Sequence, residues 1–392
     1  MNTVHRGILT LVRSALTGEK LTLPEGFTLE EADELIRKQS LLPMAYQGAY
    51  NCGIPVDSEI MIRYQMGYYK KLIHSEEQMQ SVENIFAAFD ENGIDYLPLK
   101  GSVLKELYPK PEFRPMGDAD ILIRNEQYEK VRQAMLALEY QEKLESDHDY
   151  TWRSKTLLVE IHKCLFSDQQ PEFRDYFGDG WGKAHAVRGN MHGLGHEDEY
   201  LYLFAHMTKH FMLSGIGARH MIDLYVYRKA YPMMDNGKIE NVLKRMHMLE
   251  FYGNIQRMLS VWFEGQPTDS VTDVITDFVF ASGNFGTTEN KLYAEEALKA
   301  EENGQKHRSK EKALIRILFP PLWYLQLSYN VLYKAPFLFP LFWVVRWFDV
   351  LLHRRKRIAK KLGIIHGMTD DKVAEYDKMM RYMGIDLRNQ VQ

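Results

Sequence analysis

The chain has 392 residues, of which 45% are hydrophobic and 26% charged, and its formal net charge is −4. That length allows two or three domains, and the weak negative charge excludes a general electrostatic attraction to nucleic acid. Two cysteines, Cys52 and Cys164, exclude a disulfide framework and fit a reducing compartment. Residues 1–18 lack the long apolar run and the cleavage site of a signal peptide, so we expect a cytoplasmic protein.

The chain divides into four predicted regions. Residues 1–93 have the periodicity of helices, and the long periodic segment 57–92 ends at Asn92-Gly93, a pair that stops helices. Residues 94–195 predict a small α/β core, residues 196–312 a helical domain that closes over it, and residues 313–392 an aromatic and basic helical region. We therefore expect an α+β fold in which a small mixed-sheet core is flanked by helical N-terminal and C-terminal regions.

Short apolar runs predict the elements of the core. Strands are expected at 94–99, 119–123, 150–153 and 157–162, and helices at 103–107 and 127–138. Pro98 restricts the first strand to an edge or an end, because proline cannot donate to a strand ladder. The glycine-rich stretch 182–196, with His185, His192 and His196, is expected to be a linker, or less often a mobile cover.

Asp118 and Asp120 are the most informative residues of the chain. They lie one residue apart in an apolar strand, so their side chains point to the same face. Two carboxylates side by side on a half-buried strand repel each other, and a hard divalent cation relieves that repulsion. Mg²⁺, or Mn²⁺, is the expected ion, because such ions prefer carboxylate oxygens.

Other residues extend this predicted metal site. Glu160, in a later apolar strand, is the candidate third ligand or general base; the alternative is an ordinary strand residue. Gly101 and Ser102 form a turn before a helix, and such turns offer backbone N–H groups to phosphate; the alternative is a plain turn with a cap. Lys100 and Arg114 are further candidate phosphate ligands, although an ordinary salt bridge is an equal prospect for Arg114.

A second polar cluster lies in the helical region. His206, Lys209 and His210 share one helix face, and Arg219 and Asp223 lie on the next predicted helix. Lys209 and Arg219 are expected to contact the phosphates of a nucleotide. The alternatives are a zinc site made by the two histidines with Asp223, and a buried hydrogen-bonded network between two helices. His162 shares the face of Glu160, and we interpret it as a packed residue.

The segment LKGSVLKELYPKPEFRPMGDADILI (residues 99–123), the VEIH sequence at 159–162 and residues 205–224 together resemble a family of uncharacterised bacterial nucleotidyltransferases, part of the polymerase-beta-like superfamily. The resemblance covers about the middle third of the chain. It implies a nucleotidyltransferase core with a helical partner domain that uses an NTP and Mg²⁺. Fifteen residues separate Ser102 from Asp118, which is more than the usual spacing in the superfamily. We expect this longer gap either to alter the phosphate site or to make Lys100 a phosphate ligand in its own right.

The predicted function is transfer of an NMP group from an NTP to an unidentified acceptor, whether sugar, lipid, protein or RNA. The alternative is a non-catalytic nucleotide-binding scaffold or sensor at a membrane surface.

Residues 313–361 hold two aromatic-rich apolar runs, both shorter than the ~20 residues that span a bilayer, and then a basic cluster at 354–361. That order fits a protein in peripheral contact with an anionic membrane, or a buried helix pair with a solvated basic end. Residues 300–312 are polar and predict an exposed linker or lid.

Overall fold

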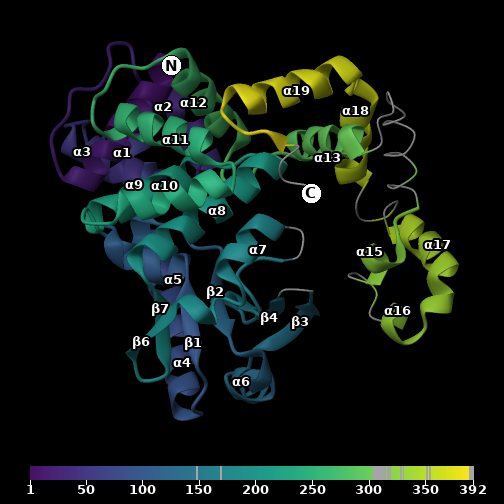
Figure 1. The fold of residues 1–392 in the computed structure, drawn as a ribbon. Helices are drawn as coiled ribbons and strands as arrows, with labels where there is room; N and C mark the ends of the chain where they lie inside the picture. The colour runs from purple at the N-terminus through teal and green to yellow at the C-terminus, as the bar shows by residue number, and fades with distance from the viewer. Residues whose placement is uncertain are drawn as a thin grey trace.

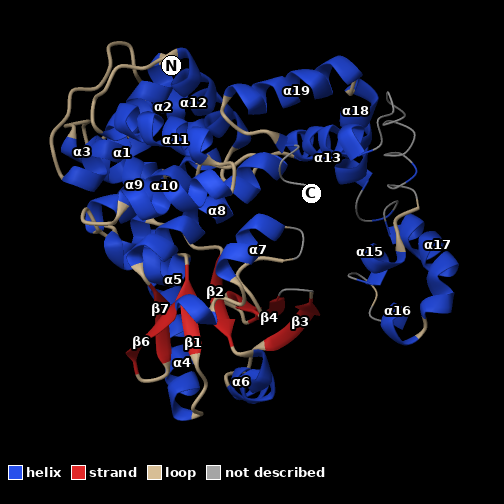
Figure 2. Cartoon of the chain, in the orientation of Figure 1, coloured by secondary structure: helices blue, strands red, loops and turns tan. Residues whose placement is uncertain are grey.

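The computed structural model describes residues 1–146, 149–167, 170–302, 315, 319–326, 329, 331–349, 352 and 355–387. It is a mixed α+β structure in which helical regions precede and follow a single described sheet, as predicted (Figures 1 and 2). The N-terminal helices are α1 (Thr3–Thr17), α2 (Leu29–Lys38), α3 (Leu42–Asn51) and α4 (Glu59–Glu91). The long helix predicted at 57–92 is confirmed as α4.

The sheet has the strand order β3-β4-β5-β2-β1-β7-β6. Its strands are β1 (Tyr96–Leu99), β2 (Asp118–Ile123), β3 (Gln141–Glu145), β4 (Asp149–Arg153), β5 (Leu158–His162), β6 (Ala184–Arg188) and β7 (Met191–Leu194). The central pair β2 and β5 is parallel, β1 and β7 are parallel at one position, and the other pairs are antiparallel. The sheet is therefore mixed, and its parallel centre carries the acidic residues singled out above.

One expectation about this sheet is wrong, and the structure decides between the two positions expected for Pro98. The glycine-rich stretch 182–196 is neither a linker nor a loose cover, because it forms the β6–β7 hairpin around a two-residue turn in which Gly189 has φ 55°. Pro98 is not on an edge strand, since β1 has neighbours on both sides. β7 pairs with β1 only at Tyr96, so Pro98 lies at the end of β1 where no ladder bond to β7 is needed.

Alternation along the strands separates two faces of the sheet. One face carries Ile121, Val159 and Ile161, which pack with Val82 and Phe89 of α4 and with α6 (Tyr128–Ala137). The opposite face carries the acidic residues of β2 and β5 and lies toward the second group of helices (Figure 1). A shift of register by one residue would bury those acids in the apolar layer. Burial of the apolar face therefore keeps the acidic side chains on the opposite face.

Short helical turns link the strands. Residues between β1 and β2 form α5 (Gly101–Leu104) and the 3-10 turns η1 (Lys105–Leu107) and η2 (Pro111–Phe113). The helix predicted at 127–138 begins with the 3-10 turn η3 (Asn125–Gln127), and α6 has Gln127 at its N-cap position without a side-chain cap. After β5 come α7 (Pro171–Phe177) and the 3-10 turn η4 (Trp181–Lys183).

The second helical region covers the acidic face of the sheet. The helices predicted at 196–212 and 218–230 are confirmed as α8 (His196–Ser214) and α9 (Ala218–Ala230). They are followed by α10 (Asn236–Arg245), α11 (Leu249–Phe263), α12 (Ser270–Ser282) and α13 (Thr288–Glu302). One continuous apolar core joins α1–α4 with α8–α13, which holds the two groups of helices together.

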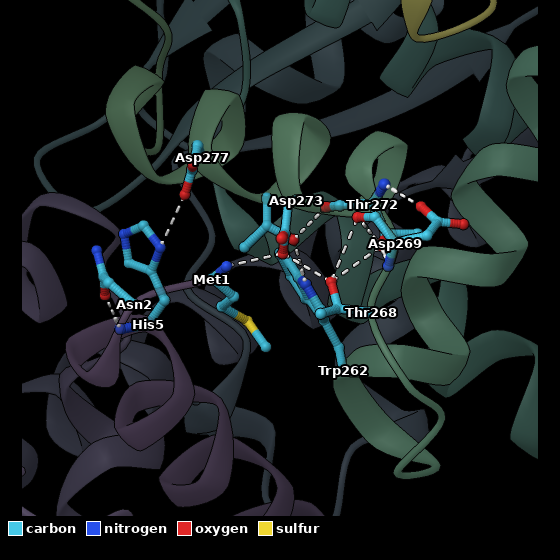
Figure 3. A network of polar contacts seen from close by, with 10 residues as sticks. Met1, Asn2, His5, Trp262, Thr268, Asp269, Thr272, Asp273 and Asp277 are labelled. Carbon is cyan, nitrogen blue, oxygen red and sulfur yellow. Dashed lines mark hydrogen bonds and ion pairs between the residues drawn. The ribbon is translucent and has the colours of Figure 1, made fainter.

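The N-terminus is fixed to α12 by a polar network (Figure 3). The terminal ammonium of Met1 contacts Asp273 at 2.8 Å, and His5 Nδ1 lies 3.2 Å from Asp277. Asp269 caps α12 in a reciprocal capping box with Thr272. Although α1 and α12 lie far apart in the sequence, they form one packed unit.

The C-terminal helices are α15 (Leu322–Gln326), α16 (Val331–Lys334), α17 (Phe339–Asp349), α18 (Arg355–Gly367) and α19 (Asp370–Tyr382), with the 3-10 turn η5 (Pro336–Leu338) before α17. α17 buries none of its residues, so the expected buried helix pair is wrong for this helix. None of the helices within the described ranges has the length and apolar character to cross a bilayer. Of the predicted linker 300–312, residues 300–302 belong to α13, and the remainder lies outside the described residues.

Candidate active site

The acidic residues of β2 and β5 form one cluster. Asp118 and Asp120 point to the same face of β2, and Glu160 is the register partner of Asp120 on the parallel strand β5. All three side chains line one cavity of about 510 Å³. The structure thus brings the three predicted acidic residues together at the parallel centre of the sheet.

Asp120 is the buried member of this cluster, with 2% of its surface exposed. Its Oδ1 accepts a hydrogen bond from Lys100 Nζ at 2.7 Å and lies 2.9 Å from His162 Nε2. Burial works to raise the pKa of Asp120, but the charge of Lys100 and the hydrogen bond from His162 outweigh it and hold the pKa below its ordinary value. His162 is therefore not simply packed, because it contacts a predicted metal ligand.

The other two carboxyl groups lack such compensation. Burial, and then the negative charge of Asp120, raise the pKa of Asp118. Burial, followed by the charges of Asp120 and Asp118, raises the pKa of Glu160 to about 7. Burial and mutual repulsion therefore both favour the protonated form of these two carboxyl groups.

The cluster fits a divalent cation. One potential ligand atom from each of Asp120, Glu160 and His162 lies within 4.8 Å of the other two. Asp118, the other predicted ligand, lines the same cavity but is not part of this group of three. Carboxylate oxygens that repel one another in a partly buried site are the donors that Mg²⁺ or Mn²⁺ prefers, so the residues present are suited to such an ion.

The turn after β1 lies beside the acidic cluster. Lys100 has φ 49°, a left-handed value that a lysine rarely adopts, and its side chain is directed to Asp120. A Cβ at Gly101 would lie 2.6 Å from Arg114 Nη1 and 2.9 Å from Met116, so a larger residue there would displace these side chains. The Ser102 hydroxyl donates to Leu99 O at 3.0 Å, and Ser102 is not among the residues that line the cavity.

Arg114 belongs to a buried ion pair. Its Nε and Nη2 donate to the two carboxylate oxygens of Asp223, each at 3.1 Å, and Tyr108 OH donates to Asp223 Oδ1 at 2.7 Å. Burial works to lower the pKa of Arg114, but Asp223 outweighs it and raises the pKa. Asp223 is thus held by Arg114 and Tyr108, and among the described residues its oxygens do not group with His206 and His210 as a zinc site would require.

Helices α8 and α9 form the side of the cavity opposite the acids. We call the acidic side, made by Asp118, Asp120, Leu158 and Glu160, the sheet wall. The helical wall is made by the cavity-lining residues of α8 and α9, which are Leu203, His206, Met207, His210, Ser214, Arg219, His220 and Asp223. Lys209, which was expected to face the same ligand, is not among the cavity-lining residues.

The helical wall is rich in nitrogen donors. The Nε2 atoms of His206 and His210 lie 3.1 Å apart, and Arg219 Nη1 donates to Pro115 O at 3.2 Å. Burial, and then the positive charge of Lys100, lower the pKa of both histidines, that of His210 to about 4. Burial, and then the charge of Arg219, lower the pKa of His220 well below its ordinary value. The three imidazoles are therefore neutral near pH 7, and Arg219 carries the fixed positive charge of this wall.

Sequence reasoning missed several residues that line the cavity or contact the residues that line it. Strand alternation already placed His162 on the face of Glu160, but its contact with Asp120 depends on the register of β2 against β5. Tyr108 and His220 gave no signal beyond their position within the family-like segments. Asn284 and Phe285 line the cavity from the loop between α12 and α13, and no local pattern connects that loop to the acids.

Comparison with known proteins gives one family and two structures. The family described as uncharacterised nucleotidyltransferase matches residues 25–264. The solution structure of the antibiotic-resistance factor ANT(2'')-Ia is 13% identical, with 47% of this chain and 97% of that chain covered and a TM-score of 0.34. The crystal structure of ANT(2'')-Ia in complex with adenylyl-2''-tobramycin is also 13% identical, covering 44% of this chain and 98% of that chain at a TM-score of 0.33. No curated protein matches the sequence.

Proposed function

The chain belongs to the family of uncharacterised nucleotidyltransferases, whose match spans more than half of it, and from this premise we propose that it transfers an NMP group from an NTP to an acceptor. The observation that carries the proposal is the position of Asp118, Asp120 and Glu160 on one wall of a cavity whose other wall presents Arg219 and imidazoles. Such a cavity can hold a ligand that is both metal-bound and anionic.

Asp118, Asp120 and Glu160 are the proposed metal ligands, with Mg²⁺ or Mn²⁺ as the ion and His162 beside Asp120. When bound, the ion would neutralise charge on the reacting phosphates. Lys100, whose Nζ lies 2.7 Å from Asp120, balances part of the acidic charge within the protein. On metal binding its ammonium is proposed to turn toward the phosphates, because the ion then takes over that balance.

The triphosphate is proposed to lie between the glycine turn and the helical wall. Val103 N and Leu104 N both donate to Lys100 O, so the N–H groups of Gly101 and Ser102 are the first of the helical turn. Arg114 Nη1 lies next to Gly101 while its other donors hold Asp223. Arg219 supplies a fixed positive charge from the opposite side. The positive charge of Lys209 on α8 is proposed to attract the phosphates from a greater distance.

In the proposed reaction, an acceptor oxygen forms a bond to the α-phosphorus of the NTP. The bond from that phosphorus to the oxygen that bridges to the β-phosphate breaks, and pyrophosphate leaves. Glu160 is the proposed acceptor of the hydroxyl proton when it does not serve as third ligand, because a carboxyl group with a pKa of about 7 is suited to general base catalysis near neutral pH. The acceptor belongs to one of four classes: sugar, lipid, protein or RNA.

The test is incubation with α-labelled NTPs, Mg²⁺ and cell extract, with label transfer and pyrophosphate release as readouts. The Asp118→Asn/Asp120→Asn double variant is expected to lower transfer at least about 10³-fold, since it removes the charge that holds the metal. Asp175→Asn, on the exposed face of α7, is the matched control and should leave transfer unchanged. Equal transfer by the double variant and the wild type would refute the proposal. Binding of NTP without pyrophosphate release would instead favour the non-catalytic scaffold.

We also propose peripheral contact with an anionic membrane at its cytoplasmic face, through η5 and α17. Phe337, Leu341 and Phe348 are 79%, 56% and 63% exposed, and the basic sequence 354–361 follows. Apolar side chains that enter the headgroup region beside a basic segment produce such binding.

Flotation with anionic and zwitterionic liposomes tests this contact. The full chain is expected to float with anionic vesicles only. A Phe337→Ser/Leu341→Ser/Phe348→Ser variant should bind at least about tenfold more weakly, because burial of these side chains contributes to the binding. Met233→Ser, at a 92% exposed site on the main body, is the control. Recovery of the wild type in the unbound fraction with both lipids would refute the proposed membrane contact.

A further inference from the structure

The loop between α12 and α13 displays an aromatic side chain at the cavity. Phe285 is 80% exposed although its residue lines the same cavity as the acidic cluster. Among the large hydrophobic residues in the described ranges, only Met233 is more exposed. Exposure of a phenyl ring to water is unfavourable, so a ligand that covers the ring of Phe285 would gain from that contact.

The loop is held in place by close backbone contacts. Gly283 and Gly286 flank the Asn284-Phe285 pair with φ values of 69° and 72°. A Cβ at Gly286 would lie 2.5 Å from the carbonyl oxygens of Ser214 and Gly215, at the end of α8. Thr287 N donates to Ser214 O at 2.8 Å, which fixes the loop to that helix end. The ring of Phe285 is therefore carried on a constrained backbone rather than on a loose tip.

Asn284 adds an unsatisfied polar group beside this ring. The residue is 5% exposed, and within the described part of the chain its Oδ1 is buried without a hydrogen-bond partner. Asn284 N donates to Lys38 O at 3.0 Å, and a Cβ at Gly217 would lie 2.6 Å from Asn284 Cα, so its backbone is fixed from two sides. A buried amide oxygen without a partner is costly unless a ligand supplies the donor.

The loop and the acidic cluster lie toward different ends of the cavity. The cavity-lining residues of α8 run from Leu203 to Ser214, which is roughly 16 Å along the helix axis at 1.5 Å per residue. The charge of Asp120 acts on α8 from Tyr202 to His210, since it adds to the effect of burial in raising the pKa of Tyr202 and opposes the lowering of the pKa of His210. The Asn284-Phe285 loop is bonded to the second end, at Ser214. A ligand with phosphates at the acids thus reaches the loop with its far part.

We propose that Phe285 and Asn284 form a subsite for the base of an adenine nucleotide. This inference rests on the proposed function and names the nucleotide that the function leaves open. The ring of Phe285 stacks on the base, as aromatic side chains do with nucleobases. The Asn284 side chain accepts from the exocyclic amine of adenine and donates to a neighbouring ring nitrogen, the pairing in which asparagine matches adenine rather than guanine.

Titration calorimetry with three probes tests the subsite: Mg²⁺-ATP, Mg²⁺-GTP and Mg²⁺-tripolyphosphate. The wild type is expected to bind ATP more tightly than the other two. Phe285→Ala should weaken ATP binding roughly 5- to 150-fold and leave tripolyphosphate binding unchanged, because only the base contacts the ring. Phe285→Trp should retain ATP binding. Asn284→Ala should reduce the preference for ATP over GTP by a similar factor.

The matched control is Met233→Ala, which removes another highly exposed apolar side chain outside the cavity and should change no affinity. If Phe285→Ala changes neither nucleotide, or weakens ATP and tripolyphosphate equally, the subsite is overturned while the proposed function stands. If Asn284→Ala leaves the preference for ATP intact, the assignment of adenine is overturned. If the wild type binds none of the three probes with Mg²⁺, both the subsite and the proposed function are overturned.

Discussion

The two walls of the cavity carry opposite chemistry, yet burial shifts both toward the uncharged state. On the sheet wall, burial raises the pKa of Asp118 and Glu160. On the helical wall, burial lowers the pKa of His206 and His210. A cation would stabilise the ionised acids of the sheet wall, whereas an anion would pair with Arg219 and accept hydrogen bonds from the neutral imidazoles of the helical wall.

This difference indicates which ligand suits the cavity. A metal ion alone would satisfy the sheet wall and leave the helical wall without a partner, while a free phosphate ester would do the reverse. A metal-bound nucleotide supplies both charges at once, and it would raise the affinity of each wall for its own part of the ligand. The two walls can be tested separately, because changes to one should affect the metal and changes to the other the nucleotide.

Removal of the fixed charge of the helical wall should have the larger effect. Arg219→Gln is expected to weaken binding of the Mg²⁺-nucleotide roughly 10- to 150-fold, the loss of a charged hydrogen bond of about 1.5–3 kcal/mol. Binding of Mn²⁺ alone, followed by electron paramagnetic resonance, should not change. Lys229→Gln, at an exposed position on the same helix, is the control for a lost charge on α9. Loss of Mn²⁺ binding by Arg219→Gln would show that the two walls are not separable.

A smaller effect is expected on the stability of the fold. It arises from Glu160 on the sheet wall and depends on pH. Its pKa rises from the ordinary 4.5 to about 7 in the folded protein, so the folded state binds this proton more tightly than the unfolded state. The contribution of protonated Glu160 to the free energy of unfolding is therefore complete below pH 4.5 and falls as the pH rises. Above pH 7 the ionised group destabilises the metal-free fold.

Glu160→Gln should remove this pH dependence. In metal-free buffer at pH 8, urea unfolding is expected to give the variant a free energy of unfolding about 1–3 kcal/mol above that of the wild type; this range is discounted because 29% of the Glu160 side chain is exposed. The difference should vanish near pH 4. Mg²⁺ should stabilise the wild type more at pH 8 than at pH 5.5. A difference that is constant across this range would contradict the assigned pKa.

Strand alternation made the acidic half of the cavity predictable from the sequence. Asp118, Asp120 and Glu160 occupy alternate positions in apolar strands, and that pattern is local. The register that brings His162 to Asp120 is not local, so its contact escaped prediction. The β6–β7 hairpin was missed because the glycines of 182–196 dominated its interpretation, although Gly189-Asn190 is a two-residue turn signal.

Other features depend on contacts between distant segments. Phe285 reaches the cavity because glycines near 215 and 285, some 70 residues apart in the sequence, let two loops touch. Arg114 was expected to bind phosphate or to form a salt bridge, and only the fold identifies Asp223 as its partner. Motif spacing could not supply either result, since both require knowledge of which helix covers which face.

The ion pair of Arg114 with Asp223 joins the helical wall to the segment between β1 and β2. Arg114 and Tyr108 come from the segment between β1 and β2, whereas Asp223 comes from α9. The side chains of the pair are 5% and 7% exposed, and loss of one partner from such a buried pair costs about 3–5 kcal/mol, because the other charge is left unpaired. The pair therefore holds α9 against this segment. Such a contact preorganises the cavity, so we expect a nucleotide that enters it to spend little of its binding free energy on ordering the protein.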